Sequence, residues 1–208
     1  MACRRALIAI GCFAVAVGLP AAGASDTSRE QLHATLWMQT SAEYRAAVEQ
    51  VFRLATGRLS EVMQPGTAAL EQQGMDPRQL ASLPTAIIVD LDETILDNSY
   101  YQARLVRERR EYDEGSWQAW MQEARAPVLP GALEFLDAAA HEGHRIFYLT
   151  NRACEPAALP PAGSARANTT IAVDPCPAKT ATQRNLIALG LPGGDDPDAL
   201  LLRNERPE

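Results

Sequence analysis

The stretch Thr85-Ala-Ile-Ile-Val-Asp90-Leu-Asp-Glu-Thr94 decides the fold. Residues 85–89 are a continuous run of β-branched and apolar side chains, which is typical of a buried strand in a parallel sheet. Side chains alternate along an extended chain, so Asp90 and Asp92 are expected to face one site while Leu91 points away from it. The sequence therefore predicts a buried parallel strand with two carboxylates at its carboxyl end.

A second apolar run, Arg145-Ile-Phe-Tyr-Leu149, is expected to stop at Thr150-Asn-Arg152. The helical segment Gly131–His141 precedes this run, so the two strands can be parallel neighbours joined through a helical crossover. Their carboxyl ends would then share one edge of the sheet, which is where ligands bind in open α/β folds. The predicted fold class is therefore α/β, a parallel sheet flanked by helices.

The remaining segments complete this outline. Thr40-Ser-Ala-Glu43 resembles a capping box that opens an amphipathic helix reaching Val62, and Trp37 just before it is expected to belong to the core. Residues 98–130 are charged and rich in Tyr and Trp, which favours a small helical cap. Thr180–Leu189 is predicted to be a helix, and Ala199–Leu202 a short apolar strand.

Two carboxylates at this spacing suit phosphoryl transfer. One can attack phosphorus to give an aspartyl-phosphate, while the other donates a proton to the leaving oxygen and later activates water. Magnesium fits such a site because it takes hard oxygen ligands and bridges to phosphate oxygens. An isolated Asp-X-Asp is more often a solvated turn. Here, however, Asp90-Leu-Asp92 and Thr150-Asn-Arg152 follow two predicted strands, and this combination arises by chance far less often than a single motif.

Two stretches together carry a family resemblance: Asp90-Leu-Asp-Glu-Thr-Ile-Leu-Asp-Asn-Ser99 and Tyr148-Leu-Thr-Asn-Arg152. They resemble the bacterial acid phosphatases of class B/C type, the lipoprotein e 5'-nucleotidase family of the haloacid dehalogenase (HAD) superfamily. The resemblance extends from about Trp37 to the end of the chain and is weakest over residues 155–177. It implies a HAD-like, Rossmann-type sheet with N-terminal helices and a small cap.

On this resemblance, Asp90 is the nucleophile and Asp92 is the general acid and base. Thr150 holds a phosphoryl oxygen, and Asn151 is its neighbour in the site. The implied cofactor is Mg²⁺, which would contact the Asp90 carboxylate and the backbone carbonyl of Asp92. The implied activity is hydrolysis of phosphomonoesters through an aspartyl-phosphate on Asp90.

The resemblance also implies small-molecule substrates, either nucleoside monophosphates or aryl phosphates, held between aromatic side chains of the cap. Trp117 stands at the spacing expected of the stacking residue, and Tyr100 is a second candidate. Both aromatic side chains could instead pack the cap onto the core. A net charge of −7 argues against nucleic acid as the main partner.

The sequence departs from the family after its second motif. A basic third motif and an acidic fourth motif are not found, and Lys179 and Asp195-Asp-Pro-Asp198 are weak substitutes for them. We therefore expect the chain to be C-terminally incomplete, without the last strand or strands. A catalytically impaired homologue or a non-catalytic phosphate-ester binding protein remains an alternative, and a dehalogenase or phosphotransferase with the same nucleophile is less favoured.

The N-terminus has the layout of a secretory signal. Arg4 and Arg5 precede an apolar run, Ala6–Leu19, and small residues follow at Ala22-Gly-Ala24, so residues 1–24 are predicted to be a signal peptide cleaved after Ala24. Residues 25–208 would then be a single periplasmic or secreted domain. Lipidation at Cys12 is less favoured because the apolar run continues past it.

Cleavage would leave Cys154 and Cys176 as the remaining cysteines. In an exported protein an even pair of cysteines favours a disulfide over a metal site or a nucleophile. Two thiols are also too few for a structural zinc site, and the three histidines show no ligand spacing with them.

Overall fold

The computed structural model describes residues 30–62, 68–69, 72–156 and 174–205. The predicted signal peptide, its cleavage point and Cys12 lie outside these residues, as does most of the segment 155–177. Within the described part of the chain, no helix is long and apolar enough to span a membrane.

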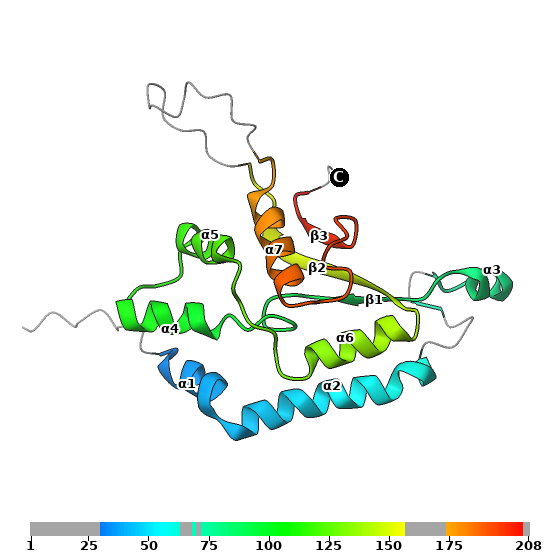
Figure 1. The fold of residues 1–208 in the computed structure, drawn as a ribbon, viewed down its shortest axis with the longest axis horizontal. Coiled ribbons are helices and arrows are strands. Elements are labelled where there is room, and N and C mark those ends of the chain that lie inside the picture. Colours follow the sequence, from blue (N-terminus) through cyan, green and yellow to red (C-terminus); the bar gives the residue numbers. More distant parts are fainter. Residues whose placement is uncertain (1–29, 63–67, 70–71, 157–173, 206–208) are drawn as a thin grey trace, which may run out of the picture.

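Three parallel strands form the central sheet (Figure 1). They hydrogen-bond in the order β1-β2-β3 and comprise β1 (Ala86–Val89), β2 (Arg145–Ala153) and β3 (Leu200–Arg203). The predicted α/β fold with a parallel sheet is therefore confirmed. The helix α6 (Ala132–His141) lies in the connection between β1 and β2, where the sequence predicts the crossover.

The strand register places the chemical motifs at one edge. Val89 pairs with Tyr148 and Thr150 pairs with Leu202, so the residue after β1 and the second half of β2 reach the same end of the sheet. The prediction that the second strand stops after Leu149 is wrong, because β2 continues to Ala153. Pairing with β3 supplies the backbone hydrogen bonds that extend it.

The sheet is buried more on one face than on the other. Ile87 and Val89 pack against the hydrophobic core, whereas Ile88 is 69% exposed and Leu149 on β2 is 52% exposed. The prediction that residues 85–89 are buried on both faces is therefore wrong for the Ile88 side. No helix of the described residues covers that side chain.

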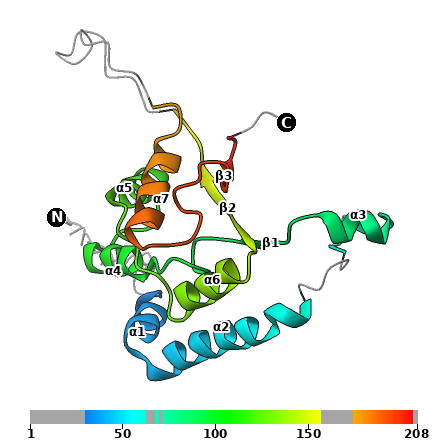
Figure 2. The same ribbon diagram turned by 45° about the vertical axis from the view of Figure 1, so that its right-hand side comes forward.

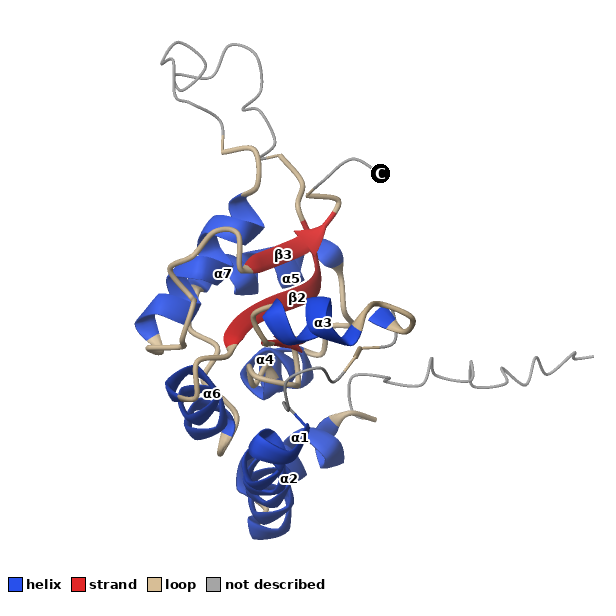
Figure 3. Ribbon diagram, turned by 90° about the vertical axis from the view of Figure 1, so that its right-hand side faces the viewer, coloured by secondary structure: helices blue, strands red, loops and turns tan. Residues whose placement is uncertain are grey.

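Of the two N-terminal helices, α1 (Leu32–Thr40) and α2 (Ala42–Val62), the second packs against α6, so that α6 lies between α2 and the sheet (Figures 1 and 3). Helix α1 instead packs against α4 (Ser99–Glu108). Phe52 of α2 contacts Phe135 of α6, with ring centroids 5.8 Å apart. Of the predicted apolar face, Leu59 is buried and Val48 packs against the core, but Val51 is 65% exposed.

The predicted start of the long helix is displaced by one residue. Thr40 ends α1, and Ser41 caps α2 by accepting a 2.9 Å hydrogen bond at its Oγ from the backbone N–H of Tyr44. Trp37 is 51% exposed and meets the Tyr44 ring edge-on at 5.0 Å. The prediction that Trp37 belongs to the core is therefore wrong.

Residues 98–130 contain the two helices expected of a cap, α4 (Ser99–Glu108) and α5 (Glu114–Glu123). Arg104 of α4 donates two hydrogen bonds to Glu123 of α5, at 2.6 and 2.9 Å. The segment then returns towards α6 past α7 (Pro177–Ala188), where the buried amide of Asn185 bonds both backbone groups of Ala126. These contacts fix the cap segment against the core.

One short helix, α3 (Pro77–Ser82), stands apart from the other helices just before β1 (Figure 2). Asp76 caps it through a 2.7 Å hydrogen bond from the backbone N–H of Arg78, and Pro77 fits its first turn. None of its residues is buried, so local capping rather than packing defines this helix.

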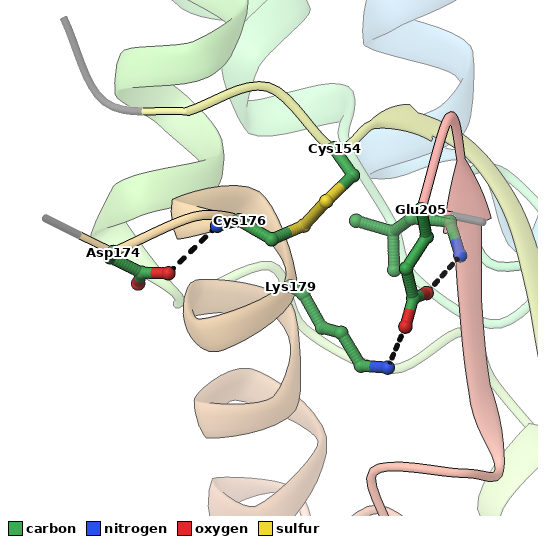
Figure 4. The surroundings of a disulfide bond; sticks show 6 residues. Cys154, Asp174, Cys176, Lys179 and Glu205 are labelled. Carbon is green, nitrogen blue, oxygen red and sulfur yellow. Dashed lines mark hydrogen bonds and ion pairs between the residues drawn. A yellow bond between two sulfur atoms is a disulfide. The ribbon is translucent and has the colours of Figure 1, made fainter. Parts of the chain in front are cut away.

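The predicted disulfide between Cys154 and Cys176 is present, with a Cα–Cα distance of 4.8 Å (Figure 4). Cys154 follows the end of β2, and Cys176 is the N-cap residue of α7, which begins at Pro177, three residues before the predicted start at Thr180. The bond therefore fixes the N-terminus of α7 beside the carboxyl end of β2.

Candidate active site

A tight turn directly after β1 presents the two aspartates. Leu91 is fully buried, and its carbonyl accepts hydrogen bonds from the backbone N–H groups of Ile95 and Leu96, at 2.9 and 2.8 Å. Glu93 has a φ of 57°, a left-handed conformation that costs a non-glycine residue about 1 kcal/mol. Buried Leu91 thus anchors the turn, and its neighbours Asp90 and Asp92 lie on the more open side, as predicted.

Asp90 is exposed at the carboxyl end of β1. Its Oδ2 accepts a 2.9 Å hydrogen bond from the hydroxyl of Thr94 in the same turn. An exposed carboxylate oriented by one hydroxyl remains open to an incoming ligand. This is the environment that a carboxylate nucleophile needs.

Asp92 is held much more firmly. The Arg152 guanidinium donates from Nη2 to Oδ1 at 2.7 Å and from Nε to Oδ2 at 3.0 Å, which makes a two-pronged ion pair. The side-chain amide of Asn98 donates to Oδ1 at 2.8 Å, and the Thr150 hydroxyl lies 3.5 Å from Oδ2. The Asp92 carboxylate is therefore fixed in one orientation.

Arg152 is itself held from three sides. Its side chain is 2% exposed, and its Nη1 donates to the Oγ1 of Thr182 on α7 at 2.9 Å. The guanidinium carbon lies 5.7 Å from the ring centroid of Trp117 on α5, which is within cation–π range. One buried arginine thus links the sheet, α7 and the cap.

Asn98 makes a second connection between the cap and Asp92. It is buried just before α4, and its Oδ1 accepts a 2.8 Å hydrogen bond from the indole Nε1 of Trp120 on α5. Because the same amide donates to Asp92 through Nδ2, the chain Trp120–Asn98–Asp92 is continuous. Trp120 is 2% exposed and is therefore well placed to hold the amide in a single orientation.

The structure brings together some of the predicted residues. Thr150 is buried beside Asp92, and its Oγ1 accepts a 3.2 Å hydrogen bond from the backbone N–H of Arg152. Asn151 is exposed on β2, and no described contact joins it to either aspartate. Of the predicted stacking residues, Trp117 is half-buried with its ring edge-on to Tyr101 at 5.2 Å, and Tyr100 is 56% exposed.

Neither predicted substitute for the later motifs lies next to Asp90 in this structure. Lys179 forms an ion pair with Glu205, whose Oε2 also accepts a 3.0 Å hydrogen bond from the backbone N–H of Leu202 (Figure 4). The acidic turn at residues 195–198 precedes β3, and its Asp196 lies 3.6 Å from Arg145 at the beginning of β2. That turn is therefore at the amino ends of the strands, opposite the two catalytic candidates.

The environment of a third carboxyl group, that of Glu93, is also perturbed. Desolvation raises the pKa of Glu93, and the negative charge of Asp92 raises it further. Hydrogen bonds from the side chain and backbone of Asn98 oppose this rise. Desolvation is therefore the main cause of the raised Glu93 pKa, and the neighbouring carboxylates add to it.

The oxygen donors at this turn match the preference of a divalent cation. Asp90 offers an exposed carboxylate beside Asp92, and Mg²⁺ is commonly held by one or two carboxylates together with water and phosphate oxygens. Among the described residues there is no cluster of three or more His, Cys, Asp or Glu side chains placed to bind a metal ion. The carboxylate oxygens of Asp90 and Asp92 are of the kind that binds a divalent cation.

Sequence reasoning missed Arg152, Asn98 and Thr182. Arg152 belongs to the quoted Thr-Asn-Arg motif but received no role, although a carboxylate on a neighbouring strand end needs a cationic partner when it is partly buried. Asn98 was likewise quoted within the first motif without a role. For Thr182, helical spacing on α7 carries no signal that points to Arg152.

Comparison with known families agrees with this geometry. The model of the HAD superfamily, subfamily IIIB (acid phosphatase), matches residues 19–159, which is more than half of the chain. The chain belongs to this acid phosphatase family. The matched region includes both aspartates of the turn and the whole of the Thr150-Asn-Arg152 motif.

Solved acid phosphatases have a similar fold. The class C acid phosphatase from Bacillus anthracis with tungstate bound matches with a TM-score of 0.63 and 27% identity, over 88% of this chain and 61% of that chain. A second structure of the class C enzyme from Bacillus anthracis matches with a TM-score of 0.62 and 28% identity, over 86% and 60% respectively. The chain thus spans about three fifths of the length of these solved acid phosphatases.

Proposed function

We propose that this chain is an exported, magnesium-dependent acid phosphatase that hydrolyses phosphomonoesters through an aspartyl-phosphate on Asp90. The observation that carries the proposal is the contrast within one turn. Asp90 is exposed with one hydroxyl partner, whereas Asp92 is fixed by a guanidinium and an amide. An open carboxylate beside an immobilised one matches the division of work between a nucleophile and an acid/base.

In the first step, a carboxylate oxygen of Asp90 attacks phosphorus. The bond between phosphorus and the ester oxygen breaks, and its electron pair goes to that oxygen, which takes a proton from Asp92. The products are an alcohol and an aspartyl-phosphate. Thr94 orients the attacking carboxylate, and the partners of Asp92 keep its carboxyl group aimed at the leaving oxygen.

In the second step, Asp92 takes a proton from a water molecule whose oxygen attacks the same phosphorus atom. The bond between phosphorus and the Asp90 oxygen breaks, which releases inorganic phosphate and restores the Asp90 carboxylate. The Thr150 hydroxyl, buried near Asp92, is placed to hold a phosphoryl oxygen, and exposed Asn151 would be its neighbour.

Magnesium would be held by the Asp90 carboxylate and the backbone carbonyl of Asp92. When bound, it offsets the negative charge that the phosphoryl oxygens bring to two aspartates. A tungstate ion is bound in one of the Bacillus anthracis structures, and tungstate is a tetrahedral oxyanion like phosphate. This supports an oxyanion site in the family without fixing the identity of the metal.

We infer that the substrates are nucleoside monophosphates or aryl phosphates. Their ring would lie against the cap, where half-buried Trp117 and exposed Tyr100 are the candidate contacts. Trp117 already contacts Arg152 and Tyr101, so a substrate ring would add to an existing aromatic cluster. The substrate is a small molecule, and the net charge of −7 does not favour nucleic acid.

Export to the periplasm or the medium is part of the proposal. The layout of residues 1–24 motivates it, with cleavage after Ala24. The Cys154–Cys176 disulfide supports it as well, because such bonds persist in oxidising compartments. N-terminal sequencing of the exported protein is expected to begin at Ser25.

Phosphate release by the chain from Ser25 tests the proposed activity. With p-nitrophenyl phosphate and magnesium, Asp90→Asn is expected to lower turnover at least about 10³-fold, because it removes the nucleophile. Asp195→Asn, in the exposed turn at the other end of the sheet, is the matched control and is expected to keep full turnover. Saturable binding of the ester without turnover by the unaltered chain would instead favour the binding-protein alternative.

A further inference from the structure

We propose that Arg152 is a positioning residue for the acid/base carboxyl group of Asp92, held for that purpose by the cap and α7. This inference rests on the proposed function and assigns a role to a side chain that the mechanism above does not use directly. The two side chains are 60 residues apart in the sequence and join the turn after β1 to the end of β2.

The geometry of the pair favours orientation over phosphate binding. Two nitrogens of the guanidinium, Nη2 and Nε, are directed at the two oxygens of Asp92, and the third, Nη1, donates to Thr182. All three nitrogens therefore already have acceptors within 3.0 Å. A guanidinium has five N–H groups, so one on Nη1 and one on Nη2 remain, but the 2% exposure of the side chain leaves phosphate oxygens little access to them.

The surroundings of Arg152 keep it in this orientation. Its side chain is 2% exposed, so its positive charge has lost most of its hydration and depends on the Asp92 carboxylate. Trp117 of α5 covers the guanidinium at 5.7 Å, and Thr182 holds it from α7. These two contacts and the ion pair with Asp92 together hold the guanidinium in place.

Asn98 completes the arrangement from the opposite direction. It donates to the same Oδ1 that accepts the Nη2 bond, and Trp120 fixes the amide by donating to its Oδ1. The carboxyl group of Asp92 is thus restrained by groups whose own orientations are fixed by α5. We therefore expect the packing of the cap to affect how well Asp92 is placed to protonate the leaving oxygen. This effect needs no contact between these cap residues and the substrate.

The predicted consequence depends on the leaving group. An alkyl alcohol is a poor leaving group and needs a well-placed proton donor, whereas p-nitrophenolate leaves readily without one. Arg152→Gln is therefore expected to lower kcat about 10²-fold for an alkyl monophosphate ester but less than about 5-fold for p-nitrophenyl phosphate. KM is expected to stay unchanged, because Arg152 does not hold the phosphoryl group.

Two further variants make this comparison specific. Arg152→Lys is expected to recover part of the kcat for the alkyl ester, because an ammonium group keeps the charge but cannot donate from two fixed nitrogens. Arg58→Gln is the control outside the cap, since Arg58 also makes a two-pronged pair, with Glu61 on α2, at 2.8 and 3.4 Å. It is expected to leave the ratio of the two kcat values unchanged.

The outcomes separate this inference from the proposed function. Equal losses of kcat on both esters, or a raised KM with unchanged kcat, would overturn the positioning role, whereas turnover surviving in Asp90→Asn would overturn the proposed nucleophile. Nuclear magnetic resonance tests the pair independently of turnover. A slowly exchanging Arg152 Nε–H signal is expected in the unaltered chain and in Asp90→Asn but not in Asp92→Asn, and its absence from all three would contradict the inference.

Discussion

Two ion pairs lie near the carboxyl end of the sheet, and both are largely removed from solvent. In the first, Arg152 and Asp92 have side chains that are 2% and 21% exposed, and in the second Lys179 and Glu205 are 17% and 18% exposed. Each carboxylate also accepts a further hydrogen bond, from the Asn98 side chain or the Leu202 backbone N–H. By burial and bonding the two pairs are alike.

Their surroundings differ. Asp92 follows β1 two residues after an exposed aspartate, and the cap reaches it through Asn98 and Arg152. The Lys179–Glu205 pair instead joins the first turn of α7 to the residues after β3, beside the disulfide (Figure 4). A shielded charge pair is therefore not by itself evidence of a site, and its position relative to an open, reactive side chain decides the matter.

The largest effect is expected from Asp92→Ala. Loss of the acid/base should lower turnover of an alkyl ester at least about 10²-fold. The same change leaves the buried Arg152 charge without its partner, which should lower the free energy of unfolding by about 3 kcal/mol. Urea titration and steady-state kinetics measure the two effects, and a variant of unaltered stability would show that the Arg152 pair is not formed.

Removal of the disulfide comes next in expected size. The double variant Cys154→Ser, Cys176→Ser opens a bond between residues 22 apart, and the entropy regained by the unfolded chain should cost about 3 kcal/mol of stability. Turnover should fall much less, because Thr182 lies further along α7. Thermal unfolding with and without a reductant checks this, and a reductant effect that persists in the double variant would contradict it.

The smallest effect is expected from Lys179→Met, which keeps the length of the side chain and removes its charge. Loss of a partly exposed pair should lower the free energy of unfolding by about 1 kcal/mol. Turnover should stay within about 2-fold, since Lys179 bonds Glu205 rather than a group at the site. A drop of ten-fold or more would reinstate Lys179 as a cation for the phosphoryl group.

The elements that sequence alone predicts well are those whose signal is local. β1, α6 and the first half of β2 follow from apolar runs and helical periodicity, and their parallel arrangement follows from the crossover rule. The extension of β2 to Ala153 was not predicted, because it depends on pairing with β3, whose partner residues lie about 50 positions further along. The predictions that Ile88 and Trp37 are buried are wrong for a similar reason. Neither propensity nor hydrophobicity specifies which neighbour covers a side chain.

In the candidate site, too, local sequence signals could be predicted, whereas contacts between distant residues could not. Asp90, Asp92 and Thr150 were predicted as site residues because two motifs end two predicted strands, and the resemblance assigned their proposed roles. Arg152 belongs to the second motif, but the sequence predicts no role for it. Its partner Asp92 lies 60 residues away, and only the sheet register brings the two together. Asn98 and Trp120 required the packing of α4 against α5, which no spacing in the sequence reveals.

In the proposed mechanism, Asp90 carries the phosphoryl group and Asp92 assists its removal. The most direct test is mass spectrometry of the Asp92→Asn variant, quenched in acid after mixing with p-nitrophenyl phosphate and magnesium. Release of p-nitrophenolate needs little help from an acid, but hydrolysis of the intermediate needs a base, so the aspartyl-phosphate should accumulate. We expect one phosphoryl group on the peptide that contains Asp90, and none when Asp90→Asn is added. A phosphoryl group on another residue, or p-nitrophenolate release with no covalent intermediate, would contradict it.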